Sequence, residues 1–161
     1  MSTAKKYLYQ LGIALLMFGL ISCSTTTNSK ENQVTNNKLN PVVYFEIPVN
    51  DMARAVQFYE TVFGFDFTRE IIDSNEMALF PFEADGLGIS GALAKGEVYK
   101  PTKEGVLIYF RTNSIDIILT LASSTGAKIL YPKTSNGDLG FVAEIEDSEG
   151  NRIGLHEALK P

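Results

Sequence analysis

The sequence contains one cysteine and one histidine among its 161 residues. A single cysteine cannot form a disulfide within the chain, and with one histidine it cannot complete a Cys/His zinc cage. Basic clusters are also missing, since 14 Lys and Arg residues stand against 19 Asp and Glu and give a net charge of -5. Because phosphate neutralisation dominates affinity for nucleic acid, we expect no nucleic-acid partner.

Long hydrophobic runs are absent too. The apolar run at residues 11–21 has 11 residues, whereas a membrane-spanning helix needs about 20. With Lys5 and Lys6 before it, the run is typical of the core of a secretory signal. It ends at residues 20–23 (LISC), which resemble a bacterial lipobox. This resemblance implies a signal peptide at residues 1–22 and lipidation of Cys23; the alternative is a short membrane anchor with a buried free cysteine.

A lipidated Cys23 would anchor the chain in the cell envelope, in the outer membrane or the outer leaflet of the cytoplasmic membrane. Loss of residues 1–22 would remove Lys5 and Lys6 and change the net charge from -5 to -7. Residues 23–40 are polar and show no apolar period, which predicts a flexible tether. The folded domain is therefore predicted at residues 41–161.

The first half of this domain has the pattern strand, helix, three strands. Residues 42–47 are β-branched and aromatic and predict a strand. Asn50 or Asp51 offers a helix N-cap, and Gly64 a helix end. The apolar stripe of the helix consists of Met52, Ala55, Val56, Tyr59 and Phe63. Further strands are predicted at residues 65–71, 76–82 and 87–93.

The second half repeats the order. Its predicted strands are residues 106–111, 127–131, 141–146 and 152–156. Between the first two, Asn113 or Ser114 caps a helix that Gly126 ends, and its stripe is Ile115, Ile118, Leu119 and Ala122. Two such halves indicate a duplicated module and an α+β fold. We predict two βαβββ modules that form one curved, cup-like mixed sheet with helices on the outside.

Two segments carry a family resemblance. Residues 47–65 (IPVNDMARAVQFYETVFGF) resemble the first module of the vicinal oxygen chelate superfamily, also called the glyoxalase, bleomycin-resistance and dioxygenase superfamily. Residues 140–156 (GFVAEIEDSEGNRIGLH) are similar to its closing hairpin. The resemblance covers residues 41–158 and supports the fold, while it is specific for no single activity. Members often form dimers, so it also implies a homodimer.

Members usually hold a divalent metal with His, Gln or Glu side chains on paired strands. The matching positions here carry residues that do not suit such a metal: Tyr44, Leu107, Gly154 and the segment 90–92 (SGA). We therefore expect no metal and no other cofactor. An alignment shifted by two residues would instead bring Glu46 or His156 into these positions.

Strand alternation predicts which residues line the cup, because residues two apart share a face. The predicted binding residues are Tyr44, Glu46, Ser90, Leu107, Tyr109, Arg111, Arg152 and His156. Glu46 is also the candidate catalytic base, since a carboxyl desolvated in an apolar cup has a raised pKa. The alternatives are an ion pair of Glu46 with Arg111 or Arg152, and a local hydrogen bond for His156.

Three functions fit this pattern. The first is a metal-free protein that binds or sequesters a small organic molecule in its cup, where the acidic charge favours a cationic ligand. The second is an enzyme of the superfamily, a lyase, isomerase or dioxygenase, that uses a metal or Glu46 as a base. The third is an interaction subunit that uses the fold as a scaffold.

Overall fold

The computed structural model describes residues 42–86 and 88–160. The predicted signal peptide, Cys23 and the tether lie outside the described residues. Within the described part of the chain, no helix is long and apolar enough to cross a membrane.

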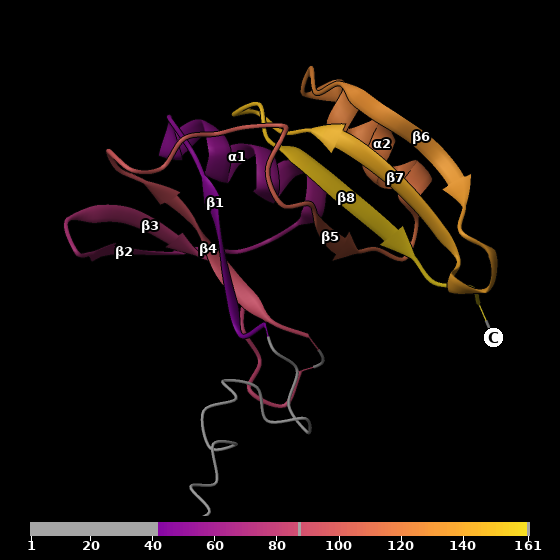
Figure 1. The fold of residues 1–161 in the computed structure, drawn as a ribbon, viewed down its shortest axis with the longest axis horizontal. Helices are drawn as coiled ribbons and strands as arrows, with labels where there is room; N and C mark the ends of the chain where they lie inside the picture. The colour runs from indigo at the N-terminus through magenta and orange to yellow at the C-terminus, as the bar shows by residue number, and fades with distance from the viewer. Residues whose placement is uncertain (1–41, 87, 161) are drawn as a thin grey trace, which may run out of the picture. The chain divides into compact units, whose positions relative to one another are not determined.

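The chain folds into two modules of the same order (Figure 1). The first consists of β1 (Tyr44–Pro48), α1 (Met52–Phe63), β2 (Thr68–Ile72), β3 (Asn75–Leu79) and β4 (Ser90–Lys95). The second consists of β5 (Ile108–Arg111), α2 (Ile115–Ser124), β6 (Ile129–Ser135), η1 (Gly137–Leu139), β7 (Phe141–Glu146) and β8 (Arg152–Glu157), where η1 is a single 3₁₀ turn. This order confirms the predicted α+β fold of two βαβββ modules.

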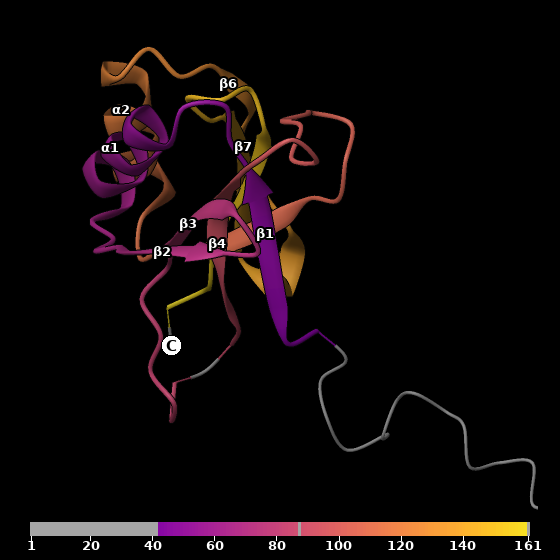
Figure 2. The ribbon, with the colours of Figure 1, turned by 90° about the vertical axis from the view of Figure 1, so that its left-hand side faces the viewer.

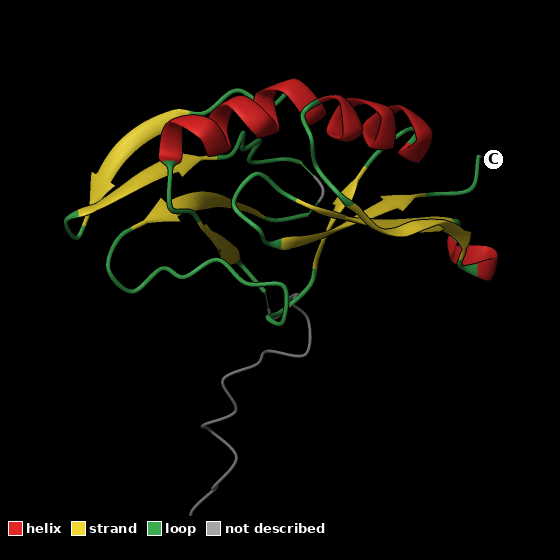
Figure 3. Cartoon of the chain, turned by 90° about the horizontal axis from the view of Figure 1, so that it is seen from above, coloured by secondary structure: helices red, strands yellow, loops and turns green. Residues whose placement is uncertain are grey.

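Each module builds a four-stranded mixed sheet, so the predicted curved sheet is divided between two hydrogen-bonded sheets. The strand orders are β1-β4-β3-β2 and β5-β8-β7-β6. β1 runs parallel to β4, and β5 runs parallel to β8, while the other pairs are antiparallel. The crossover helices α1 and α2 contact each other and lie on one side of the strands (Figures 2 and 3). The opposite side of each sheet is called the open face below.

Both helices begin at predicted caps, and α1 ends at the predicted Gly64, whereas α2 ends at Ser124 with Thr125 as its C-cap, just before the predicted Gly126. Asp51 caps α1, because its side chain accepts hydrogen bonds from the backbone N–H groups of Ala53 and Arg54. Gly64 ends α1 in the left-handed conformation, with φ 71°, that glycine adopts without strain. Ser114 caps α2 by accepting from the N–H of Ile117.

Aromatic rings fill the space between the helices and the sheets. Phe110 of β5 is the contribution of the second module to this cluster. Its ring centroid lies 5.3 to 6.1 Å from the rings of Phe45, Tyr59, Phe63, Phe65 and Phe80, all in the first module. Such tilted and edge-to-face pairs add to the stabilisation from burial alone. The two modules therefore share one hydrophobic core.

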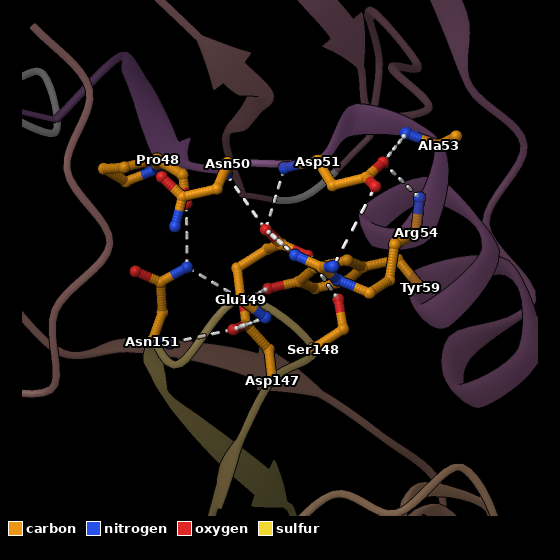
Figure 4. Close-up of polar contacts among 10 residues, drawn as sticks. All are labelled: Pro48, Asn50, Asp51, Ala53, Arg54, Tyr59, Asp147, Ser148, Glu149 and Asn151. Carbon is orange, nitrogen blue, oxygen red and sulfur yellow. Dashed lines mark hydrogen bonds and ion pairs between the residues drawn. The ribbon is translucent and has the colours of Figure 1, made fainter.

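Hydrogen bonds and an ion pair connect the turn between β7 and β8, in the second module, to the start of α1 (Figure 4). The Glu149 side chain is 0% exposed and accepts hydrogen bonds from the N–H groups of Asn50 and Asp51, each at 2.9 Å. Its other oxygen accepts from Nε of Arg54 at 2.7 Å. Burial alone would raise the pKa of Glu149, but these hydrogen bonds outweigh it and lower the pKa below the ordinary value.

Candidate ligand-binding site

The strands of the first module present two different faces. Phe45 and Ile47 of β1 belong to the hydrophobic core, whereas Tyr44 and Glu46 are exposed on the open face. This is the alternation predicted from the sequence. In β4, the paired register places Ser90 beside Tyr44 and Ala92 beside Glu46.

A cavity of about 490 Å³ lies at the end of this sheet where β1 and β4 begin and β3 ends. It is lined by Val43, Tyr44, Asp66, Thr68, Leu79, Phe80, Pro81, Phe82, Ser90 and Gly91. Most of these side chains are apolar or aromatic, and a few carry hydroxyl or carboxylate groups. A mainly apolar lining with a few polar groups is the usual composition of a small-molecule site.

The polar groups of the cavity differ in whether they already form hydrogen bonds within the protein. The Ser90 hydroxyl lies 3.3 Å from the carbonyl oxygen of Phe80 and 3.1 Å from that of Pro81, to which it donates. Burial, with a contribution from the nearby charge of Glu46, raises the pKa of the Tyr44 phenol. Tyr44 is therefore neutral at physiological pH, and its side chain offers a ligand both a hydroxyl group for hydrogen bonding and an aromatic ring.

One residue of the linker between the modules, Tyr99, packs on part of this open face. Tyr99 packs against Met77, Ala92 and Ala94, and its hydroxyl donates to Oε2 of Glu46 at 2.8 Å. The pKa of Tyr99 is raised, first by this hydrogen bond and then by burial. Glu46 is thus exposed and engaged by a linker residue, rather than desolvated in an apolar cup as its predicted role as a base requires.

The second open face contains the other predicted residues, and Tyr109 and His156 make local contacts there. The Tyr109 ring lies over Gly154, where an added Cβ would approach the ring to 2.5–2.7 Å. The backbone carbonyl of Leu139 lies 2.7 Å from Nε2 of His156, in accord with the local hydrogen bond considered above. Arg111 is paired in register with His156. Leu107 precedes β5 and is half-buried.

The ion pair proposed for Glu46 is not formed among the described residues. Arg152 instead pairs with Glu144, with Nε 2.7 Å from Oε2, on the adjacent strand β7. The register explains this choice, because Glu144 and Arg152 both lie on the open face of the same antiparallel pair. Partners on neighbouring strands meet with little loss of side-chain freedom, whereas Glu46 lies in the other sheet.

The structure therefore brings only two of the predicted binding residues together in a cavity, Tyr44 and Ser90. The other eight lining residues, Asp66, Thr68 and Phe82 among them, were not predicted from the sequence, nor was the contact of Tyr99 with Glu46. Asp66 and Thr68 could have been recognised together, because alternation places both on the same face of the strand expected at residues 65–71. Phe82 and Tyr99 lie in loops, where no period predicts the direction of a side chain.

The donor groups present do not suit the divalent metal that the fold family implies. Across residues 42–86 and 88–160, no three His, Cys, Asp or Glu side chains converge in a way that could hold a metal. The Tyr109 ring covers the glycine at the position of the closing strand, Gly154, and the Ser90 hydroxyl already donates to two carbonyl groups. Three or four nitrogen or oxygen ligands are needed for such a site.

A larger hollow of about 630 Å³ lies on the helical side, between α1, the end of α2 and the end of β7. Its charged groups have partners within the protein. Arg54 binds Glu149, and Lys128 lies 3.3 Å from Glu146, which also contacts Lys103. Because these groups already neutralise one another, we place the candidate site at the cavity beside Tyr44, at the end of the first sheet.

A family model described as Glyoxalase/Bleomycin resistance protein/Dioxygenase superfamily matches residues 39–155. The chain belongs to this superfamily. No curated protein matches it significantly. Among solved structures, a glyoxalase/bleomycin resistance protein/dioxygenase domain from a Frankia species superposes with a TM-score of 0.59 at 16% identity, covering 75% of this chain and 99% of that one.

Two further similar structures belong to proteins that are named for a function. An antibiotic-binding protein from a Streptomyces species, TnmS3, gives a TM-score of 0.54 at 23% identity and covers 75% of this chain and 98% of its own. The fosfomycin resistance protein FosX from Listeria monocytogenes gives 0.56 at 14% identity, covering 75% and 95%. At these identities the likeness establishes the superfamily fold alone.

Proposed function

We propose that this superfamily member is a metal-free lipoprotein that binds or sequesters a small organic molecule in the cavity beside Tyr44. The observation that carries the proposal is the cavity itself, about 490 Å³ of mainly apolar lining with hydroxyl groups at its wall. Sites for drug-sized molecules typically measure 300–1,000 Å³ and have this composition. The antibiotic-binding protein of the same fold supports a binding role.

The unsuitable donor set supports the metal-free part of the proposal. Glu46 is not among the residues that line the cavity and is held by the linker residue Tyr99, which favours binding over proton abstraction, because a base must lie within reach of its substrate. The partners that complete this function are the small molecule, the membrane through Cys23, and a second copy of the chain.

A thermal-shift screen of small organic molecules, run with and without divalent ions, tests the binding role. A ligand of the native state should raise the melting temperature in proportion to its occupancy, with no requirement for metal. Tyr44→Ala should abolish the shift, because it removes the aromatic wall of the cavity. Tyr131→Ala is the matched control, since Tyr131 is 42% exposed against 46% for Tyr44 and lies on the other sheet.

Two outcomes would count against the binding role. A shift that appears only with a divalent ion would restore a metal site. A shift that is lost equally in Tyr44→Ala and Tyr131→Ala would move the ligand away from this cavity.

The lipid anchor has a separate test. Cys23→Ala should move the protein from the membrane fraction to the soluble fraction or leave it unprocessed, because thioether formation requires the cysteine sulfur. At about 0.8 kcal/mol per buried CH₂, the acyl chains provide most of the membrane affinity. Fractionation followed by mass spectrometry of the N-terminus measures both effects. A processed, unmodified chain that still partitions into membranes would refute lipidation as the anchor.

A further inference from the structure

The cavity contains a single charged residue. Asp66 is the one charged side chain among the residues that line it, and no lysine or arginine is present there. Asp66 is exposed and makes no hydrogen bond or ion pair with any residue that the structure describes. A carboxylate beside an apolar wall loses part of its hydration when a ligand covers it, so a ligand must compensate this cost with a positive charge or a hydrogen-bond donor.

The aromatic neighbours of Asp66 favour the same ligand chemistry. Tyr44 is 46% exposed and Phe82 70% exposed, so both rings are open to a molecule in the cavity. An ammonium group within about 6 Å of a ring centroid is attracted by the negative face of that ring. A flat apolar group can stack on the same rings.

The cavity offers few free hydrogen-bond donors to an anion. The Ser90 hydroxyl already donates to two backbone carbonyls, and the N–H of Phe80 donates to the carbonyl of Gly91 at 3.0 Å. The chain as a whole carries a net charge of -5, which repels anions and attracts cations over the range that salt leaves unscreened.

We infer that the ligand class of this cavity is an amphipathic organic cation, with a protonated amine beside Asp66 and an apolar ring against Tyr44 and Phe82. The inference rests on the proposed binding function and deepens it. The carboxylate sets the sign of the preferred charge, and the two rings set the preference for a flat apolar body.

Three probes with one ring system and different charges test the inference by titration calorimetry on the purified full chain. They are 2-(1-naphthyl)ethylamine, 2-(1-naphthyl)ethanol and 1-naphthylacetate, which are cationic, neutral and anionic at pH 7. The amine should bind at least about tenfold more tightly than the alcohol, since one charge-assisted hydrogen bond contributes roughly that factor. The anion should bind most weakly.

Asp66→Asn should reduce the affinity for the amine to within about twofold of that for the alcohol, and leave the affinity for the alcohol unchanged. Asp138→Asn is the matched control, because it removes the same charge from an exposed turn in the second module and should preserve the preference for the amine. Equal affinities of the three probes for the wild-type chain, or an equal effect of both variants, would overturn the inference about charge.

The proposed function fails in a different way. If the probes bind without preference and Tyr44→Ala removes binding of the alcohol, the cavity remains a ligand site and only the charge inference is wrong. If none of the probes binds, or Tyr44→Ala changes no affinity, both the cavity as a ligand site and the inference built on it are refuted.

Discussion

Glu149→Ala should lower the free energy of unfolding by about 2–3 kcal/mol, because the Glu149 carboxylate is buried even though its ionic partner Arg54 is half exposed. The variant removes the acceptor for the N–H groups of Asn50 and Asp51 and for the guanidinium of Arg54. Donors at the start of a helix that lose their acceptor add to the cost. Chemical denaturation at pH 7 measures the change, and Glu60→Ala on the exposed side of α1 is the control.

The pH dependence separates this ionic contribution from a general loss of packing. The pKa of Glu149 is depressed in the folded state, so its stabilisation is fully present above the ordinary value of 4.5 and is lost as the pH falls below it. The difference between the wild-type chain and Glu149→Gln should therefore shrink between about pH 5 and pH 3. A difference that is independent of pH across this range would show that the charge of Glu149 contributes nothing.

The importance of Glu149 was not predicted from the sequence. A closing hairpin was expected at residues 140–156, and its turn is present between β7 and β8. Its role in the fold depends on contacts 95 to 99 residues distant in sequence, which no local pattern encodes. A buried glutamate in a turn resembles a solvated one until the partner module is placed beside it.

Elements whose hydrophobic pattern repeats over many residues were predicted well, and irregular segments were not. The stripe from Met52 to Phe63 spans a whole helix, so chance matches are few and α1 has the expected bounds. The strand expected at residues 65–71 begins only at Thr68, because Phe65 and Phe67 turn into the aromatic cluster instead of joining the ladder. Packing there outweighed the β propensity of the segment.

The candidate site was predicted in part for the same reason. Tyr44 and Ser90 lie on regular strands, where alternation assigns a face, and both line the cavity. The contact between Tyr99 and Glu46 joins a linker to a strand and depends on how the loop closes, which the sequence does not specify. Arg152 pairs with a residue of the neighbouring strand β7, and the pattern within one strand does not show which strand lies beside it.

Phe110→Ala should cost about 3 kcal/mol, at the lower end of the range for buried aromatic residues because Phe110 is only partly buried. Its ring touches the rings of the first module from the second, so its loss leaves a cavity at the junction of the modules. Tyr109→Ala is the matched control. Tyr109 is the preceding residue of β5, faces the opposite side and is half exposed, so we expect a cost below about 1.5 kcal/mol.

The shape of the unfolding transition tests whether the two modules share one core. If one core unites the modules, Phe110→Ala shifts a single cooperative transition to lower denaturant and leaves its slope unchanged. Fluorescence and circular dichroism should then report the same midpoint. If the modules were stable separately, the variant would produce two transitions, or a shift no larger than that of Tyr109→Ala. The aromatic cluster is thus expected to stabilise the junction that the Glu149 contacts also span, which makes the two modules one folding unit.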